Sequence, residues 1–167
     1  MCDKKVPCVH CGGCCHFREE GFLTPEEDLK IKGQVYGKTG IIYLYPFSRY
    51  TITLSKNEKD VLETKAKKNN IDISILPKKV FYDIDNDKVY VIDYFLDSDI
   101  CPFWKEERCS VYDNRPEICR QFPNITMDHN IDIEKIIGHR NIRLINMTIP
   151  DIVEVIKEKL VKQGVSV

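Results

Sequence analysis

The sequence predicts an α+β fold in which a small antiparallel sheet is flanked by helices and by loops that carry cysteines. Capping residues precede segments of helical spacing, and apolar residues alternate with polar ones in the segments between them. The cysteines are confined to two clusters, one before residue 16 and one between residues 101 and 119. The 167 residues contain no internal repeat and no long linker, so we expect one domain over 1–167.

The first expected helix begins at a capping box formed by Thr24 and Glu27, with Pro25 at its first helical position. We expect this helix to end by Val35, in a region that glycines interrupt. β-Branched and aromatic residues then predict one or two strands within 41–54.

A second capping box, formed by Ser55 and Glu58, predicts a charged helix over 56–68. Its inward-facing residues are expected to be Val61, Leu62 and Ala66. A third, amphipathic helix is expected over 150–163, with Gly164 as its stop. Its apolar residues at helical spacing are Ile152, Val153, Ile156, Leu160 and Val161.

Strand signals fill the region between the second helix and the second cysteine cluster. Residues 71–76 alternate with period two, as a half-buried strand does. The segments 80–84 and 88–96 flank the turn residues 85–87 and predict a β-hairpin. We therefore expect the antiparallel sheet to lie between the cysteine-bearing loops.

The charge balance excludes some classes of partner. The chain has 25 Lys and Arg against 26 Asp and Glu, a net charge of −1, which argues against nucleic-acid binding because no basic surplus is present to neutralise phosphates. No apolar stretch approaches the roughly 18 residues that span a bilayer, so we expect no membrane association. The first residues do not resemble a secretory signal, and we expect a cytoplasmic protein with reduced thiols.

The first cysteine cluster is a C-x-x-C-x-x-C-C run made of Cys8, Cys11, Cys14 and Cys15. Two intervening residues let two thiolates turn back onto one metal ion, and Gly12 and Gly13 give the backbone the freedom that this turn needs. Three cysteines at this spacing also match the run that holds three irons of a 4Fe–4S cluster, whose fourth ligand is a remote cysteine, often followed by proline. The run therefore predicts metal binding, as zinc or as an iron–sulfur cluster.

The second cluster supplies the remote cysteines, Cys101, Cys109 and Cys119. Cys101 is followed by Pro102 and so fits the remote ligand of an iron–sulfur cluster. Pro116 favours a helix start that places Cys119 in or near the first turn, where the helix dipole would lower the pKa of its thiol. We expect the loops from both ends of the chain to close around the metal site.

Cations and histidines lie close to both clusters. A four-thiolate site carries a net charge of about −2 with zinc or with an oxidised 4Fe–4S cluster, so cations beside it should help. Arg115 and Arg120 are the candidate cofactor-binding cations, and the alternative is that they form weak ion pairs on a solvated surface. His10 and His16 flank the run and are either additional ligands or ordinary loop histidines.

The cysteine motifs resemble those of the YkgJ-type cysteine-cluster family, a zinc- or iron-chelating domain. The motifs that carry the resemblance are CxxCGxCC, then CPF, and then C-S-V-Y-x-x-R-P-x-x-C-R-x-F-P. The resemblance implies that seven cysteines act together, namely Cys8, Cys11, Cys14, Cys15, Cys101, Cys109 and Cys119. Cys2 lies outside the pattern and is interpreted as a free thiol.

These observations predict a cytoplasmic metal-binding protein that holds a 4Fe–4S cluster or zinc through thiolates from both ends of the chain. The family resemblance leaves an alternative, because related motifs occur in flagellin lysine N-methylases: a redox or lysine-methylating enzyme, or its accessory subunit, that uses the metal centre. A third reading is a disulfide-stapled interaction module. No substrate or protein partner is indicated by these residues.

Overall fold

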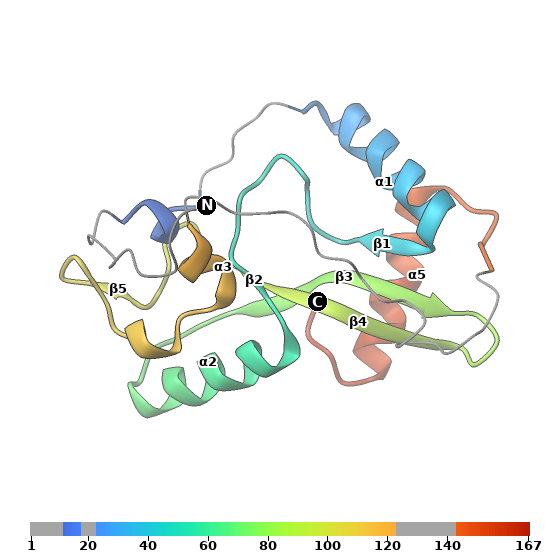
Figure 1. Ribbon diagram of the computed structural model, residues 1–167. Coiled ribbons are helices and arrows are strands. Elements are labelled where there is room, and N and C mark those ends of the chain that lie inside the picture. The colour runs from blue at the N-terminus through green and yellow to red at the C-terminus, as the bar shows by residue number, and fades with distance from the viewer. Residues whose placement is uncertain (1–11, 18–22, 123–142) are drawn as a thin grey trace.

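The computed structural model describes residues 12–17, 23–122 and 143–167. A four-stranded antiparallel sheet in the order β1-β3-β4-β2 connects the two ends of the molecule (Figure 1). Its strands are β1 (Ile41–Tyr43), β2 (Thr53–Leu54), β3 (Ile75–Asp83) and β4 (Lys88–Leu96). The α-helices are α1 (Pro25–Thr39), α2 (Lys56–Lys68), α3 (Glu117–Gln121) and α5 (Ile149–Lys162). The expected α+β class with a small antiparallel sheet is confirmed.

The helix starts that the sequence predicts are confirmed at their caps. The Thr24 hydroxyl accepts the Glu27 N–H at 3.2 Å, and the Glu27 carboxylate accepts the Thr24 N–H at 2.8 Å. Ser55 and Glu58 form the same reciprocal pair at the start of α2, and Thr148 caps α5. Among the described helices, none is long and apolar enough to cross a bilayer.

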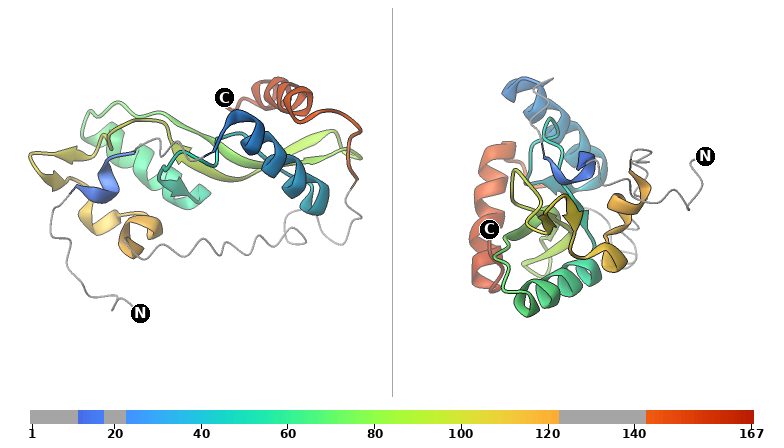
Figure 2. Two further views of the ribbon diagram at one scale, coloured as in Figure 1. Left: turned by 90° about the horizontal axis from the view of Figure 1, so that it is seen from above. Right: turned by 90° about the vertical axis from the view of Figure 1, so that its left-hand side faces the viewer.

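The described residues pack into two apolar cores toward opposite ends of the β3–β4 hairpin (Figures 1 and 2). The first, called here the cysteine core, contains Cys15, Phe17, Ile52, Leu54, Leu62, Ala66, Leu96, Cys101, Phe103, Val111 and Cys119. The second, called here the helical core, contains Tyr36, Ile42, Val80, Val89, Ile152, Ile156 and Leu160. The helices α1 and α5 lie at the end of the helical core, and α2 and α3 lie at the end of the cysteine core.

Helix α1 is longer than the sequence predicts, because it continues past Val35 to Thr39. Each glycine inside a helix costs about 1 kcal/mol relative to alanine. Tertiary packing offsets that cost: the Tyr36 ring is buried in the helical core, and its hydroxyl accepts the Ile145 N–H at 2.7 Å. The helix ends at Gly40, whose φ of 69° is in the left-handed region.

Two further expectations are wrong in detail. The expected strand over 71–76 is paired only from Ile75 onward, because the Ile71 N–H bonds to the Ala66 carbonyl and belongs to the end of α2. Val61 and Val161, expected to face inward, are 40% and 61% exposed, respectively. The predicted hairpin at 80–96 and the predicted inward residues Leu62 and Ala66 are confirmed.

The β3–β4 ladder is irregular around Lys78, with register shifts on either side of Lys79. The preceding residue is Pro77, which cannot donate a ladder hydrogen bond and is typically found at such bulges. The Lys78 Nζ donates to the Thr53 Oγ1 at 2.5 Å, and the neighbouring Lys79 forms a buried ion pair with Asp93 at 2.8 Å. At the bulge, the side chains of Lys78 and Lys79 thus bind residues of the strands β2 and β4.

Candidate metal centre

Two segments that are far apart in the sequence lie side by side at the cysteine core. The Cys101 N–H donates to the Cys15 carbonyl at 2.7 Å, and the Phe17 N–H donates to the Asp99 carbonyl at 2.8 Å. His16 and Ile100 form an antiparallel bridge between these two bonds. Residues 15–17 are therefore paired with residues 99–101 through backbone hydrogen bonds.

Five cysteines lie within the described ranges, and none of these five is in a disulfide. They are Cys14 and Cys15 in the 3₁₀ helix η1 (Gly13–Cys15), Cys101 after β4, Cys109 in β6 (Arg108–Cys109) and Cys119 in α3. Cys15, Cys101 and Cys119 are buried in the cysteine core, and Cys14 and Cys109 pack against it. The structure thus brings Cys14 and Cys15 together with the three cysteines of the distal cluster.

The thiols interact with one another in pairs. The sulfurs of Cys14 and Cys15 are 3.9 Å apart. Cys14 and Cys119 shift each other's pKa, and so do Cys15 and Cys101. Each cysteine of the first segment is therefore electrostatically coupled to a cysteine of the second.

Gly12 sets the backbone turn that presents the first pair. Its φ of 71° is left-handed, and the Cys15 N–H closes the turn onto the Gly12 carbonyl at 2.9 Å. A Cβ at this position would lie 3.2 Å from the Trp104 ring and 3.3 Å from the His16 ring. Glycine is needed here both for the backbone conformation and for the close approach of Trp104.

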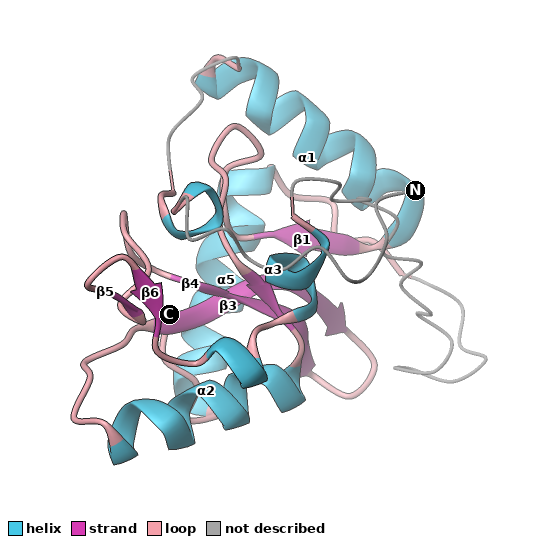
Figure 3. Ribbon diagram, turned by 60° about the vertical axis from the view of Figure 1, so that its left-hand side comes forward, coloured by secondary structure: helices cyan, strands magenta, loops and turns pink. Residues whose placement is uncertain are grey.

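Cys101 and Cys109 are positioned by a small hairpin, β5 (Trp104–Lys105) with β6, that the sequence analysis missed (Figure 3). Trp104 pairs with Cys109, and the Trp104 N–H bonds to the Cys101 carbonyl at 2.9 Å. The turn residues Glu106 and Glu107 both have positive φ, a conformation usually supplied by Asn-Gly. Because two glutamates give no turn signal, this hairpin could not be recognised from the sequence.

Helix α3 carries Cys119, and it begins directly after Pro116, as predicted. Its first N–H, that of Glu117, donates to the Glu58 Oε1 at 2.7 Å. The other oxygen of the Glu58 carboxylate caps α2. One carboxylate thus joins the starts of α2 and α3 and fixes the position of Cys119.

The thiol interactions separate the pKa values of the cysteines. The interaction of Cys14 with Cys119 lowers the pKa of Cys14 and raises that of Cys119. The interaction of Cys15 with Cys101 in the same way lowers the pKa of Cys101 and raises that of Cys15. At Cys119, where a helix dipole is expected to lower the pKa, the interaction with Cys14 and burial act in the opposite direction and raise it.

Backbone N–H groups also act on the thiols. Those of Phe103 and Trp104 help to lower the pKa of the Cys101 thiol. The Val111 N–H acts in the same direction on Cys109, although burial dominates there and raises the pKa of that thiol. Backbone N–H groups near sulfur are typical of the surroundings of metal thiolates, where they tune the ligand.

The two predicted arginines differ in their surroundings. The Arg115 guanidinium stacks 4.0 Å from the Tyr112 ring centroid, and its charge contributes to lowering the pKa of Cys14. Arg120 is bound to Glu117 at 2.6 Å and to the Arg115 carbonyl at 2.8 Å, so it fastens α3 internally. Of the two arginines, only Arg115 acts on the described thiols, because its positive charge favours lower pKa values for Cys14 and Cys109.

Tyr50 is a residue that the sequence analysis did not single out. It packs against the cysteine core, with its ring centroid 6.2 Å from that of Phe17. Burial, and then the charges of the neighbouring cysteines, raise the pKa of its hydroxyl. Its Oη atom is buried and has no hydrogen-bond partner within the described ranges. Only the three-dimensional arrangement reveals this residue, because nothing in a Tyr-Thr-Ile segment marks it.

The donor chemistry of this region fits a thiophilic metal, because buried cysteines are the ligands that zinc and iron–sulfur clusters use. Within the described ranges, no three His, Cys, Asp or Glu side chains form a group that could hold a metal ion. The candidates Cys8, Cys11 and His10 lie outside the described residues, and the side chain of His16 is exposed. The described thiols therefore form part of a donor set and not a closed site.

The fold and this thiol cluster define a class of small α+β protein with a cysteine-rich centre at one end. A family model described as "CxxCxxCC: Putative zinc- or iron-chelating domain" matches residues 7–141, which is more than half of the chain. The chain belongs to this family, and the family supports a metal cofactor that is zinc or iron. No curated protein and no solved structure matches the chain.

Proposed function

We propose that this protein holds a metal centre through cysteine thiolates from both ends of its chain, in a reducing, cytoplasmic environment. The observation that carries the proposal is the backbone pairing of residues 15–17 with residues 99–101, which places thiols from both segments in one buried core. Thiolates buried this closely need a cation, because each unpaired buried charge is costly. The whole chain, residues 1–167, then acts as a single metal-binding domain.

The proposed ligands are the seven cysteines of the two clusters. Cys14 and Cys119 are coupled to each other, and with Cys8 and Cys11 they would complete one four-thiolate site. Cys15, Cys101 and Cys109 are the remaining members, and the first two form the second coupled pair. Arg115 would offset the negative charge of this centre, and Arg120 would hold α3 in place beside it.

An iron–sulfur cluster is the first choice of metal, and zinc is the second. The C-x-x-C-x-x-C run with a remote Cys-Pro is the pattern of 4Fe–4S ligands. Thiolates suit both metals, so the choice is made by spectroscopy. A brown anaerobic preparation that absorbs near about 400 nm identifies the iron–sulfur form, and a colourless one with stoichiometric zinc identifies the other.

The experiment is the measurement of iron, zinc and acid-labile sulfide in the full chain purified without oxygen. We expect about four iron atoms or one zinc ion per chain. Cys14→Ser and Cys119→Ser should each lose most of the metal, since serine does not replace a thiolate ligand. Cys2→Ser is the matched control, because Cys2 lies outside the motif, and it should retain the metal.

Two results would contradict the proposal. The first is wild-type protein with less than about half an equivalent of any transition metal after controls for loss. The second is equal metal loss in Cys2→Ser and Cys14→Ser, which would show that binding is not specific to the motif.

A further inference from the structure

The hydroxyl group of Tyr50 is an orphaned polar atom in the wall of the cysteine core. It is buried, and no described group accepts or donates a hydrogen bond to it. A buried hydroxyl without a partner destabilises the folded state, so native proteins rarely retain one without a reason. A phenylalanine at this position would avoid the cost while filling nearly the same volume.

Tyr50 packs against a core that contains three buried cysteines, Cys15, Cys101 and Cys119, and Cys14 packs against the same core. These cysteines, which come from both segments of the chain, also contribute to raising the pKa of the phenol. The orphaned atom therefore belongs to the part of the fold that holds the sulfurs of the proposed metal centre.

The segment that carries Tyr50 is fixed on both sides. Arg49 forms an ion pair with Asp99 at 2.7 Å, next to the pairing between the two cysteine segments. Thr51 is buried, and its hydroxyl donates to the Leu96 carbonyl at 2.9 Å. With both neighbours anchored and the ring packed near Phe17, the tyrosine is held against the cysteine core.

We propose that Tyr50 is a positioning residue whose hydroxyl donates a hydrogen bond to a sulfur atom of the bound metal centre. This inference rests on the proposed function and adds a residue to it. An O–H···S bond withdraws electron density from a thiolate, which stabilises the negative charge of the site. The orphaned hydroxyl then has a partner in the metal-bound protein.

The test compares Tyr50→Phe with Tyr94→Phe in the full chain. Both changes remove one phenolic oxygen from a ring that packs against the cysteine core. The Tyr94 ring lies under Lys59, and no cysteine is among the groups that shift its pKa. Tyr94→Phe is therefore a matched control for the loss of a hydroxyl away from the thiols.

The metal-free chains are loaded with Co²⁺ to record the thiolate-to-metal charge-transfer band, and with Zn²⁺ against a competing chelator to measure affinity. For Tyr50→Phe we expect a band shifted to longer wavelength and a Zn²⁺ affinity about 10- to 100-fold weaker, as for other groups that orient metal ligands. The metal-free Tyr50→Phe chain should be at least as stable as the wild type, because it loses only an unpartnered hydroxyl.

The outcomes separate the two proposals. Wild-type protein that binds neither metal ion stoichiometrically, and that holds no iron–sulfur cluster when purified without oxygen, overturns the proposed function, and the role of Tyr50 falls with it. Wild-type protein that binds metal, with Tyr50→Phe unchanged in band position and affinity, overturns the role of Tyr50 alone. Equal changes in Tyr50→Phe and Tyr94→Phe also overturn that role, because they would reflect packing and not a hydrogen bond to sulfur.

Discussion

At the scale of single residues, the buried charges of the β3 bulge are the clearest departure from an apolar interior. The Lys79–Asp93 ion pair is buried, and the Asp93 Oδ1 has no hydrogen-bond partner in the described part of the chain. Burial lowers the pKa of Lys78 from its ordinary value of 10.5 to about 8, although Asp93 opposes this shift. Because the pKa of Lys78 is lower in the folded chain than in the unfolded chain, the free energy of unfolding depends on pH.

We predict that the stability of the wild type relative to Lys78→Met rises as the pH increases from 8 to 10.5. In this window the unfolded chain binds the lysine proton more strongly than the folded chain does, so raising the pH favours folding. The relative gain should approach about 3 kcal/mol, from the 1.36 kcal/mol that one pKa unit represents. Urea unfolding of both chains at several pH values measures it.

The exposed Lys38 of α1 provides the control, since Lys38→Met removes a lysine that is in solvent. A difference between Lys78→Met and the wild type that stays constant from pH 7.5 to 10.5 would show that Lys78 is not buried in this way.

At the scale of elements, the Glu58 carboxylate couples two helices. It caps α2 through Ser55 and also accepts the first N–H of α3, the helix that holds Cys119. The capping box of α1, formed by Thr24 and Glu27, has the same local geometry and makes no such link in the described contacts. Glu58 therefore differs from Glu27 in accepting a hydrogen bond from a second helix, and substitution of each glutamate isolates this difference.

We predict that Glu27→Ala lowers the free energy of unfolding by about 1 kcal/mol, and that Glu58→Ala lowers it by about 2 kcal/mol because a second hydrogen bond is lost. Glu58→Ala should also weaken Zn²⁺ binding, since α3 is then less firmly placed, whereas Glu27→Ala should not. Denaturant unfolding and chelator competition measure the two effects. Equal Zn²⁺ affinities in the two variants would rule out the coupling of α2 to the metal centre.

The same elements show what could be predicted from the sequence. Capping boxes and the β3–β4 turn were recognised because their signals are local and lie within four residues. The extension of α1 to Thr39 and the β5–β6 hairpin were missed, since packing of Tyr36 decides the first and a glutamate turn decides the second. For the site, the spacing of cysteines identified the thiols, but the packing of Cys14 against the core that contains Cys119 and the orphaned Tyr50 hydroxyl depend on tertiary structure.

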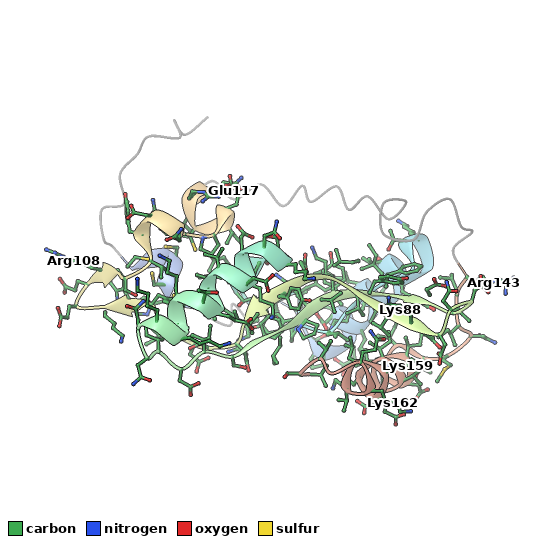
Figure 4. All side chains as sticks on the ribbon, turned by 90° about the horizontal axis from the view of Figure 1, so that it is seen from below. Lys88, Arg108, Glu117, Arg143, Lys159 and Lys162 are labelled. Atoms are coloured by element: carbon green, nitrogen blue, oxygen red, sulfur yellow. The ribbon has the colours of Figure 1, made fainter. Side chains whose placement is uncertain are left out.

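At the scale of the whole molecule, the cysteine core and the helical core are separate apolar clusters joined by the β3–β4 hairpin. Figure 4 shows Arg108 and Glu117 toward one end, and Lys88, Lys159 and Lys162 toward the other. Structural zinc contributes about 10–16 kcal/mol of apparent binding free energy, which is comparable to the stability of a whole domain. Metal removal should therefore loosen the cysteine core far more than the helical core.

The most direct test of a centre shared by both ends of the chain is hydrogen exchange of the full protein with its metal and after chelation. We predict that residues 12–17 and 99–119 lose protection together, while α1 and α5 retain theirs, because only the first two segments carry the described thiols. Loss of protection in only one of the two cysteine segments would contradict the account.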